Sequence, residues 1–356
     1  MRMILSLHKS LFKKVPVLAA FALAVAACGG TESSNNETET SEVETTEAAD
    51  SPTQALTALA TTTIWADVTS NALCDAPVES IIPAGADPHS FEPSVRVPED
   101  IASANLLVRN GLFLEEGLLA TLDSIDETNT TVVSVASLVA TFVMAGDEDH
   151  DDHADHGDED HADHDDHGDE DHADHDDHDH SAGDPHFWLD PVVVAEAVRG
   201  IASAAVDAGW PESVEACATA YAEELTALDE EIAAAVSAIE PDSRLLVTNH
   251  DAFGYFADRY GFTVLGTILP ATSTLAEANP ADLAELAEKV QETGVTAIFY
   301  DLQASSADAQ AFADRLDGIQ AVSLLSGALV EDPEIGADYL TMMRTNADRI
   351  VAGLSN

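Results

Sequence analysis

Basic residues are scarce in this chain of 356 residues, which has 13 Lys and Arg against 67 Asp and Glu and a formal net charge of −54. Four of the basic residues stand in the first 27 positions, where no acidic residue occurs. The rest of the chain is therefore almost entirely anionic. Such a surface repels a phosphate backbone, which excludes nucleic-acid binding, and it attracts cations.

Long apolar runs are also missing. The run from Val15 to Ala27 has 13 residues, too short for a membrane span but the right length for the core of a secretory signal. It leads into Val25-Ala26-Ala27-Cys28, which resembles a bacterial lipobox; the alternative is an ordinary cleaved signal with a chance Cys28. We interpret 1–27 as a lipoprotein signal peptide and Cys28 as the lipidated residue, which predicts an extracytoplasmic protein anchored to the cell membrane through lipid.

Cysteine is rare, with three in the chain. If Cys28 carries lipid, Cys74 and Cys217 remain. An even pair in an exported protein permits a disulfide, and two buried free thiols are the alternative. Between the signal and the globular part, residues 28–55 are mostly Ser, Thr, Glu and Asn, which predicts a disordered acidic tether.

The remaining sequence predicts an α/β fold, because short apolar strands alternate with helices. An apolar spacing of three or four residues predicts one long helix over 211–240, between Pro211 and Pro241, about 44 Å in length. We therefore expect an N-terminal lobe over 56–210, this linking helix, and a C-terminal lobe over 241–356, with the ligand site in the interlobe cleft. The expected strands are 61–66, 78–82, 105–109, 131–135, 244–248, 263–266, 297–300 and 320–323.

Core residues are absent from 147–180, which contains only Asp, Glu, His, Ala and Gly in an 11-residue repeat. Such low-complexity sequence predicts a disordered loop. The interleaved histidines favour a low-affinity metal-binding loop over a merely solvated acidic linker. The loop holds ten of the fourteen histidines: His150, His153, His156, His161, His164, His167, His172, His175, His178 and His180.

Outside the signal and this loop, the chain has few histidines: His89, His186 and His250. Asp-Pro precedes the first two, and each Asp could accept a hydrogen bond and orient a ring, as happens beside metal ligands. Three neutral imidazoles suit zinc. Three histidines and a water also describe a catalytic zinc site, but the chain lacks a His-Glu-x-x-His motif and a Ser or Cys nucleophile signature. We therefore do not expect an enzyme.

Four segments resemble motifs of one family: Asp87–Pro93, Asn110–Glu115, His186–Pro191 and Thr248–Tyr255. The family is that of the metal-binding lipoproteins of bacterial zinc and manganese ABC importers, cluster A-I of the solute-binding proteins. The resemblance spans about residues 60–354. It implies two Rossmann-like α/β lobes joined by a long rigid helix, with the metal between the lobes and His89, His186 and His250 as its ligands.

The resemblance also bears on the metal. Members of the family that bind manganese have a Glu at the third ligand position, where this chain has His250, and members with an Asp/His loop between the first two histidines bind zinc. Both features favour Zn²⁺ over Mn²⁺. The family's fourth ligand is an Asp, and Gly327 stands at that position here. Water or a nearby carboxylate could replace it: Asp301, which we favour among the carboxylates, Glu331 or Asp332.

By this resemblance the chain captures Zn²⁺ and delivers it, as a monomer, to an ABC permease powered by an ATPase subunit. A manganese-specific protein of the same family, and a stand-alone surface zinc buffer or adhesin, are the alternatives.

Overall fold

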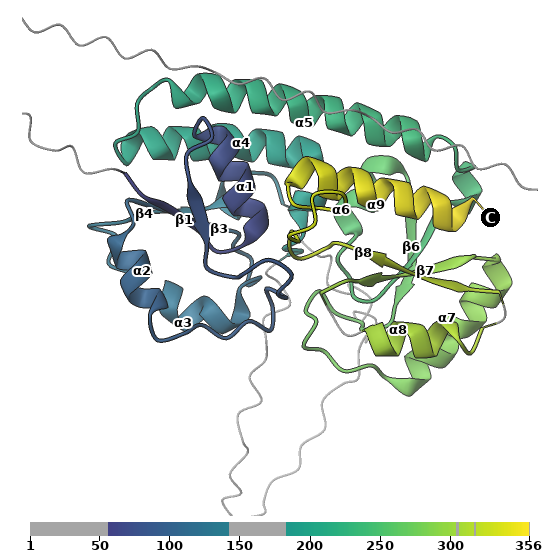
Figure 1. Ribbon diagram of the computed structural model, residues 1–356. Coiled ribbons are helices and arrows are strands. Elements are labelled where there is room, and N and C mark those ends of the chain that lie inside the picture. Colours follow the sequence, from purple (N-terminus) through teal and green to yellow (C-terminus); the bar gives the residue numbers. More distant parts are fainter. Residues whose placement is uncertain (1–55, 142–182, 304–305, 317, 356) are drawn as a thin grey trace, which may run out of the picture. The chain divides into compact units, whose positions relative to one another are not determined.

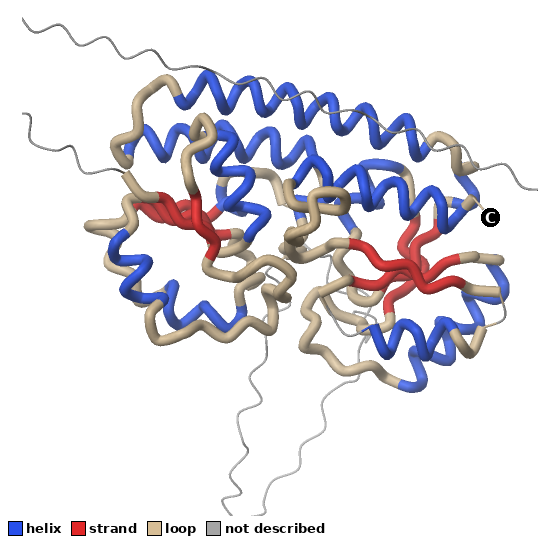
Figure 2. The backbone as a smooth tube through the Cα atoms, viewed as in Figure 1, coloured by secondary structure: helices blue, strands red, loops and turns tan. Residues whose placement is uncertain are grey.

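Neighbouring strands run parallel throughout the computed structural model, which describes residues 56–141, 183–303, 306–316 and 318–355. They form two four-stranded sheets with the same order, β2-β1-β3-β4 and β6-β5-β7-β8 (Figures 1 and 2). The expected two-lobed α/β architecture is therefore confirmed. The strands are β1 (Ala58–Ala60), β2 (Val78–Ser80), β3 (Leu106–Arg109), β4 (Thr131–Ser134), β5 (Leu245–Thr248), β6 (Thr263–Thr267), β7 (Ala297–Asp301) and β8 (Gln320–Leu324).

The first strand differs from the prediction. Residues 61–66 were expected to be extended, but β1 ends at Ala60 and helix α1 begins at Thr63. The side chain of Thr62 caps this helix by accepting a hydrogen bond from the Trp65 N–H. The β-branched run Thr61-Thr62-Thr63 favours a strand by composition, and here the capping ability of threonine at a helix N-terminus prevails.

Helices cover both faces of each sheet. On one side, α1, α4, α5, α6 and α9 bury a single hydrophobic core that contains residues of both lobes. On the other side each sheet has its own smaller core, one under α2 and α3 and one under α7 and α8 (Figure 1). The helices are α1 (Thr63–Ala72), α2 (Val97–Ser103), α3 (Leu119–Leu122), α4 (Pro191–Asp207), α5 (Val214–Val236), α6 (Gly254–Tyr260), α7 (Pro280–Thr293), α8 (Ser306–Ala313) and α9 (Tyr339–Leu354), with short 3₁₀ turns η1 (Glu116–Leu118), η2 (Val135–Ser137), η3 (Phe187–Leu189) and η4 (Pro241–Ser243).

Helix α5 is the linking helix, and it packs against α1 and α4 of the first lobe and α9 of the second. It has 23 residues and is about 35 Å long, shorter than the expected 44 Å. At its start, the Pro211 carbonyl accepts a hydrogen bond from the Val214 N–H, so residues 211–213 form a turn rather than a helical turn of α5. A disulfide joins Cys217 on α5 to Cys74, just after α1, and so ties the linking helix to the first lobe.

Among the helices that the structure describes, none has the length and apolar character needed to cross a bilayer. The predicted signal, the tether with Cys28, and the loop 147–180 with its ten histidines all lie outside the described residues.

Candidate metal centre

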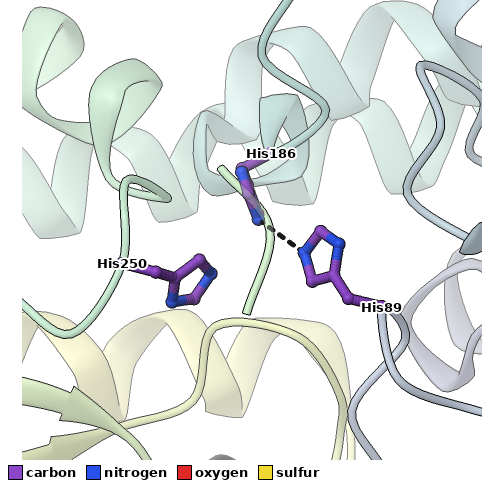
Figure 3. A group of neighbouring side chains, drawn as sticks. All are labelled: His89, His186 and His250. Atoms are coloured by element: carbon purple, nitrogen blue, oxygen red, sulfur yellow. Dashed lines mark hydrogen bonds between the residues drawn. The ribbon is translucent and has the colours of Figure 1, made fainter. Parts of the chain in front are cut away.

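Three histidines that are far apart in the sequence meet where the two lobes join (Figure 3). His89 follows β2 in the first lobe, His186 precedes η3, and His250 follows β5 in the second lobe. Each offers one ring nitrogen within 4.8 Å of the others, and the Nε2 atoms of His89 and His186 are 3.4 Å apart. All three side chains are buried. The site thus brings together the histidines that the sequence singled out.

The two Asp-Pro-His segments fold in the same way locally. Asp87 Oδ1 accepts a hydrogen bond from the backbone N–H of His89 at 3.0 Å, and Asp184 Oδ1 accepts one from that of His186 at 2.9 Å. Each aspartate therefore closes a short turn on the histidine two residues later. The intervening proline fixes its own φ, so the direction in which each histidine leaves the chain is restricted.

The ring orientations come from two carboxylates. Asp184 Oδ1 lies 2.8 Å from Nδ1 of His186, and Glu116 Oε1 lies 3.2 Å from Nδ1 of His89. A carboxylate on Nδ1 holds the Nδ1–H tautomer and leaves Nε2 as an acceptor for a metal. We expected the Asp of each Asp-Pro-His segment to orient the histidine ring, and Asp184 does so for His186. Asp87 instead contacts the backbone N–H of His89, and Glu116 contacts the His89 ring.

The motif Asn110–Glu115 places Glu116. The buried carboxylate of Glu115 accepts hydrogen bonds from Thr61 Oγ1 at 2.6 Å and from the Asn110 N–H at 2.7 Å. Gly111 has φ +90°, and a Cβ there would lie 2.4 Å from Ser134 Oγ, so only glycine fits. This folded turn directs the next residue, Glu116, at His89. The motif was identified from the sequence, but Glu116 was missed as a contact of His89. Its position directly after the motif could have indicated this role.

Electrostatics keep the imidazoles ready for a cation. Burial, reinforced by the neighbouring histidines, lowers the pKa of His186 and of His250 well below the usual value near 6.5. Both rings are therefore neutral at pH 7 and can bind a metal without first losing a proton. Burial raises the pKa of Asp184 to about 7 against the opposing hydrogen bond from the His186 N–H, so a cation in the site would favour the ionised form of Asp184.

The carboxylates considered for a fourth ligand lie in different surroundings. Asp301 ends β7, is 5% exposed, and accepts a hydrogen bond from the Gln303 N–H at 3.0 Å. Burial raises its pKa to about 6. Among the described residues, the three histidines form the one metal-competent group and Asp301 is not part of it. Glu331 and Asp332 are exposed.

Gly327, at the family's aspartate position, packs closely. A Cβ there would lie 2.9 Å from Cδ of Pro88 and 3.8 Å from Oδ2 of Asp301. A side chain at 327 would therefore require Pro88, the residue before a proposed ligand, to shift. The absence of the expected aspartate is consistent with this packing, and Asp301 is the carboxylate nearest to the place it would occupy.

Comparisons with known proteins identify the family. A family model described as zinc-uptake complex component A, periplasmic, matches residues 59–353. The chain is 31% identical over 274 residues to the zinc-binding lipoprotein AdcA of Streptococcus pneumoniae, covering 76% of this chain and 50% of that relative. It is 27% identical to the metal ABC transporter substrate-binding lipoprotein FimA of Streptococcus parasanguinis, over 84% of this chain and 89% of that relative. The chain thus spans about half the length of the AdcA relatives it matches.

The fold is similar to that of the periplasmic zinc-binding protein TroA from Treponema pallidum. The TM-score is 0.69 at 24% identity, with 84% of this chain and 99% of that one covered. This likeness shows the two-lobed fold, while the family match spans both lobes and all three histidines. The chain belongs to the family described as periplasmic component A of the zinc-uptake complex.

Proposed function

We propose that the chain is the zinc-capturing, solute-binding component of an ABC importer. In this proposal one Zn²⁺ is held by Nε2 of His89 and His186 and by a ring nitrogen of His250. The observation that carries the proposal is the convergence of three buried imidazoles, two of which have Nδ1 against a carboxylate. Such carboxylate–histidine pairs are the usual support of a zinc site.

The donor set favours zinc over manganese. Three imidazole nitrogens suit Zn²⁺, whereas Mn²⁺ prefers more oxygen ligands. The names of the AdcA relatives specify zinc, and the name of FimA specifies only a metal. Manganese binding is the second candidate, and a titration with Mn²⁺ in parallel with Zn²⁺ decides between them.

The same proposal gives the partners and the location. A membrane permease receives the ion and an ATPase subunit powers import, while lipid on Cys28 anchors the monomeric protein outside the cell membrane. The ten histidines of 147–180 collect ions weakly and pass them to the central site. A free-standing zinc buffer or adhesin would share the site but need no permease, and zinc uptake by cells that lack this chain separates the two.

Capture rather than catalysis fits the surroundings of the site. A hydrolytic zinc site needs a carboxylate or imidazole free to act as a base beside the metal-bound water. Here the Glu116 and Asp184 carboxylates contact the Nδ1 atoms of His89 and His186. They therefore orient ligands instead of serving a water molecule.

Zinc titration by calorimetry tests the proposal. On a background lacking 147–180, His89→Ala, His186→Ala and His250→Ala should each weaken the tight site at least about tenfold, because two imidazoles leave the ion under-coordinated. His167→Ala in the full chain, a loop residue, is the control and should leave the tight site unchanged. Unchanged affinity in one of the three variants would remove that residue from the site.

A further inference from the structure

A loop of the second lobe crosses to the first lobe beside the three histidines. This loop, residues 269–279 between β6 and α7, is called the strap below. Ser273 Oγ donates a hydrogen bond to Glu116 Oε1 at 2.5 Å. Thr274 Oγ1 donates one to Asp87 Oδ2 at 2.6 Å. The first bond joins residues that are 157 positions apart in the sequence, and the second joins residues that are 187 positions apart.

Both acceptors already support His89. Glu116 uses the same oxygen, Oε1, for Nδ1 of His89. Asp87 uses its other oxygen, Oδ1, for the His89 backbone N–H. Each strap hydroxyl therefore binds a carboxylate that in turn binds His89. A hydrogen bond to a carboxylate is stronger than one between neutral groups. Losing either hydroxyl would loosen a group that fixes the His89 ring or its backbone.

The other end of the strap is attached to the loop of His250. The Leu269 N–H donates to the Asn249 carbonyl at 2.8 Å, and the Asp251 N–H donates to the Ala271 carbonyl at 2.9 Å. These contacts lie on either side of His250 in the chain. The strap thus runs from the ligand loop of the second lobe to the carboxylates that hold His89 in the first.

We propose that the strap closes the two lobes around the bound ion, with Ser273 and Thr274 as positioning residues that act on His89 through Glu116 and Asp87. Separating the lobes for metal release breaks both interlobe hydrogen bonds and frees His89 and His250 from their common support. The strap therefore sets the rate at which the ion leaves. This inference rests on the proposed binding of zinc by the three histidines.

The rate of zinc release tests the strap. The full chain, loaded with one equivalent of Zn²⁺, is mixed with an excess of a chromophoric chelator in a stopped-flow instrument. Ser273→Ala and Thr274→Val should each speed release at least about threefold, and the double variant at least about tenfold. Ser273→Thr keeps the hydroxyl and should restore the slow rate. Thr272→Val, in the same loop but outside these interlobe bonds, is the matched control and should release zinc as the wild type does.

A double-mutant cycle with Glu116→Ala separates the strap from general loosening. If Ser273 acts through Glu116, Ser273→Ala should have little further effect on release in the Glu116→Ala background. Equal effects in both backgrounds, or a wild-type release rate in a folded Ser273→Ala/Thr274→Val variant, would overturn the strap proposal and leave zinc binding standing. A wild-type chain with no tight zinc site would instead overturn the proposed function.

Discussion

A single carboxylate decides how the His186 ring is presented. Asp184 contacts both the backbone N–H and Nδ1 of His186 through one oxygen, Oδ1. It therefore shapes the turn and orients the ring together. Its burial means that the ionised form is costly without a cation, as the pKa of about 7 indicates. A bound ion and this carboxylate consequently stabilise one another.

Replacing Asp184 tests this coupling. Asp184→Asn keeps an oxygen for the backbone N–H but removes the charge, so we expect zinc affinity to fall about 10- to 100-fold, the usual effect of losing such a partner. Competition with a chelator of known affinity measures it. Asp348→Asn, on the exposed face of α9, is the control. An unchanged affinity in Asp184→Asn would mean that the carboxylate serves the turn alone.

At the residue scale, the sequence was informative about ligands and less so about their supports. The three histidines stood out because the chain has no other histidine outside the predicted signal and the segment 147–180. Asp184 was predictable because it is two residues from His186. Glu116 was not, because it reaches His89 from 27 residues away through a turn that depends on the burial of Glu115. Contacts of this kind depend on tertiary packing, which local patterns do not encode.

At the scale of elements, most helices and strands follow the apolar pattern, and the error at α1 shows its limit. Apolar and β-branched residues at 61–66 fit a strand as well as a helix. Besides the Thr62 cap, partners elsewhere support the helix: Trp65 Nε1 donates to Asn110 Oδ1 at 2.8 Å, and Thr61 Oγ1 donates to Glu115 Oε1 at 2.6 Å. Both partners belong to the motif 110–115, so the metal site and α1 are built together.

Helix α1 also meets α9 of the second lobe. Asp67 on α1 accepts a hydrogen bond from the Tyr339 N–H at 3.0 Å. Burial raises the pKa of Asp67 to about 6, and the nearby Asp338 adds to this, while the hydrogen bond opposes it. A carboxyl with a raised pKa in the folded state reduces stability as pH rises from the unfolded value near 4 to about 6, and the loss is complete above that.

We therefore expect Asp67→Asn to stabilise the protein at pH 8 by about 3 kcal/mol, because the amide keeps the acceptor without the charge. Near pH 4 the two proteins should be almost equally stable. Denaturant unfolding at both pH values measures the difference, with Asp348→Asn as an exposed control on α9. A difference that does not depend on pH would show that the Asp67 charge is not the cause.

The disulfide joins Cys217 on α5 to Cys74 just after α1, two cysteines that are 143 residues apart in the sequence. Both outcomes were open from the sequence, since cysteine spacing alone does not report distance. Cross-linking so long a segment restricts the unfolded chain. We expect Cys74→Ala/Cys217→Ala to lose about 2–5 kcal/mol of unfolding free energy, measured in denaturant. Stability of the wild type that is the same with and without reductant would contradict this.

At the scale of the whole molecule, the acidic chain has two kinds of histidine-containing sequence that we propose to bind metal. The central site has three buried histidines fixed by a folded core. The segment 147–180 has ten histidines and no apolar residue larger than Ala, a composition that predicts weak sites because binding an ion would carry the cost of ordering the chain. The two should therefore differ strongly in affinity.

Deleting 147–180 should remove several weak zinc sites and leave one tight site. Native mass spectrometry of the full chain and the deletion variant, titrated with zinc, counts the ions at each concentration. Loss of the tight site on deletion would place the primary ligands in the loop. The two-lobed fold was predictable from the alternation of strands and helices.

The crystal structure of the zinc-loaded protein tests the central claim most directly. The account predicts one zinc ion, identified by anomalous scattering, with nitrogens of His89, His186 and His250 at about 2.0–2.1 Å. An oxygen of Asp301 at about 2.0–2.2 Å would make that residue the fourth ligand, and a water there would exclude it while leaving the three-histidine site intact. Zinc bound elsewhere, or with one of the three histidines turned away, would contradict the account.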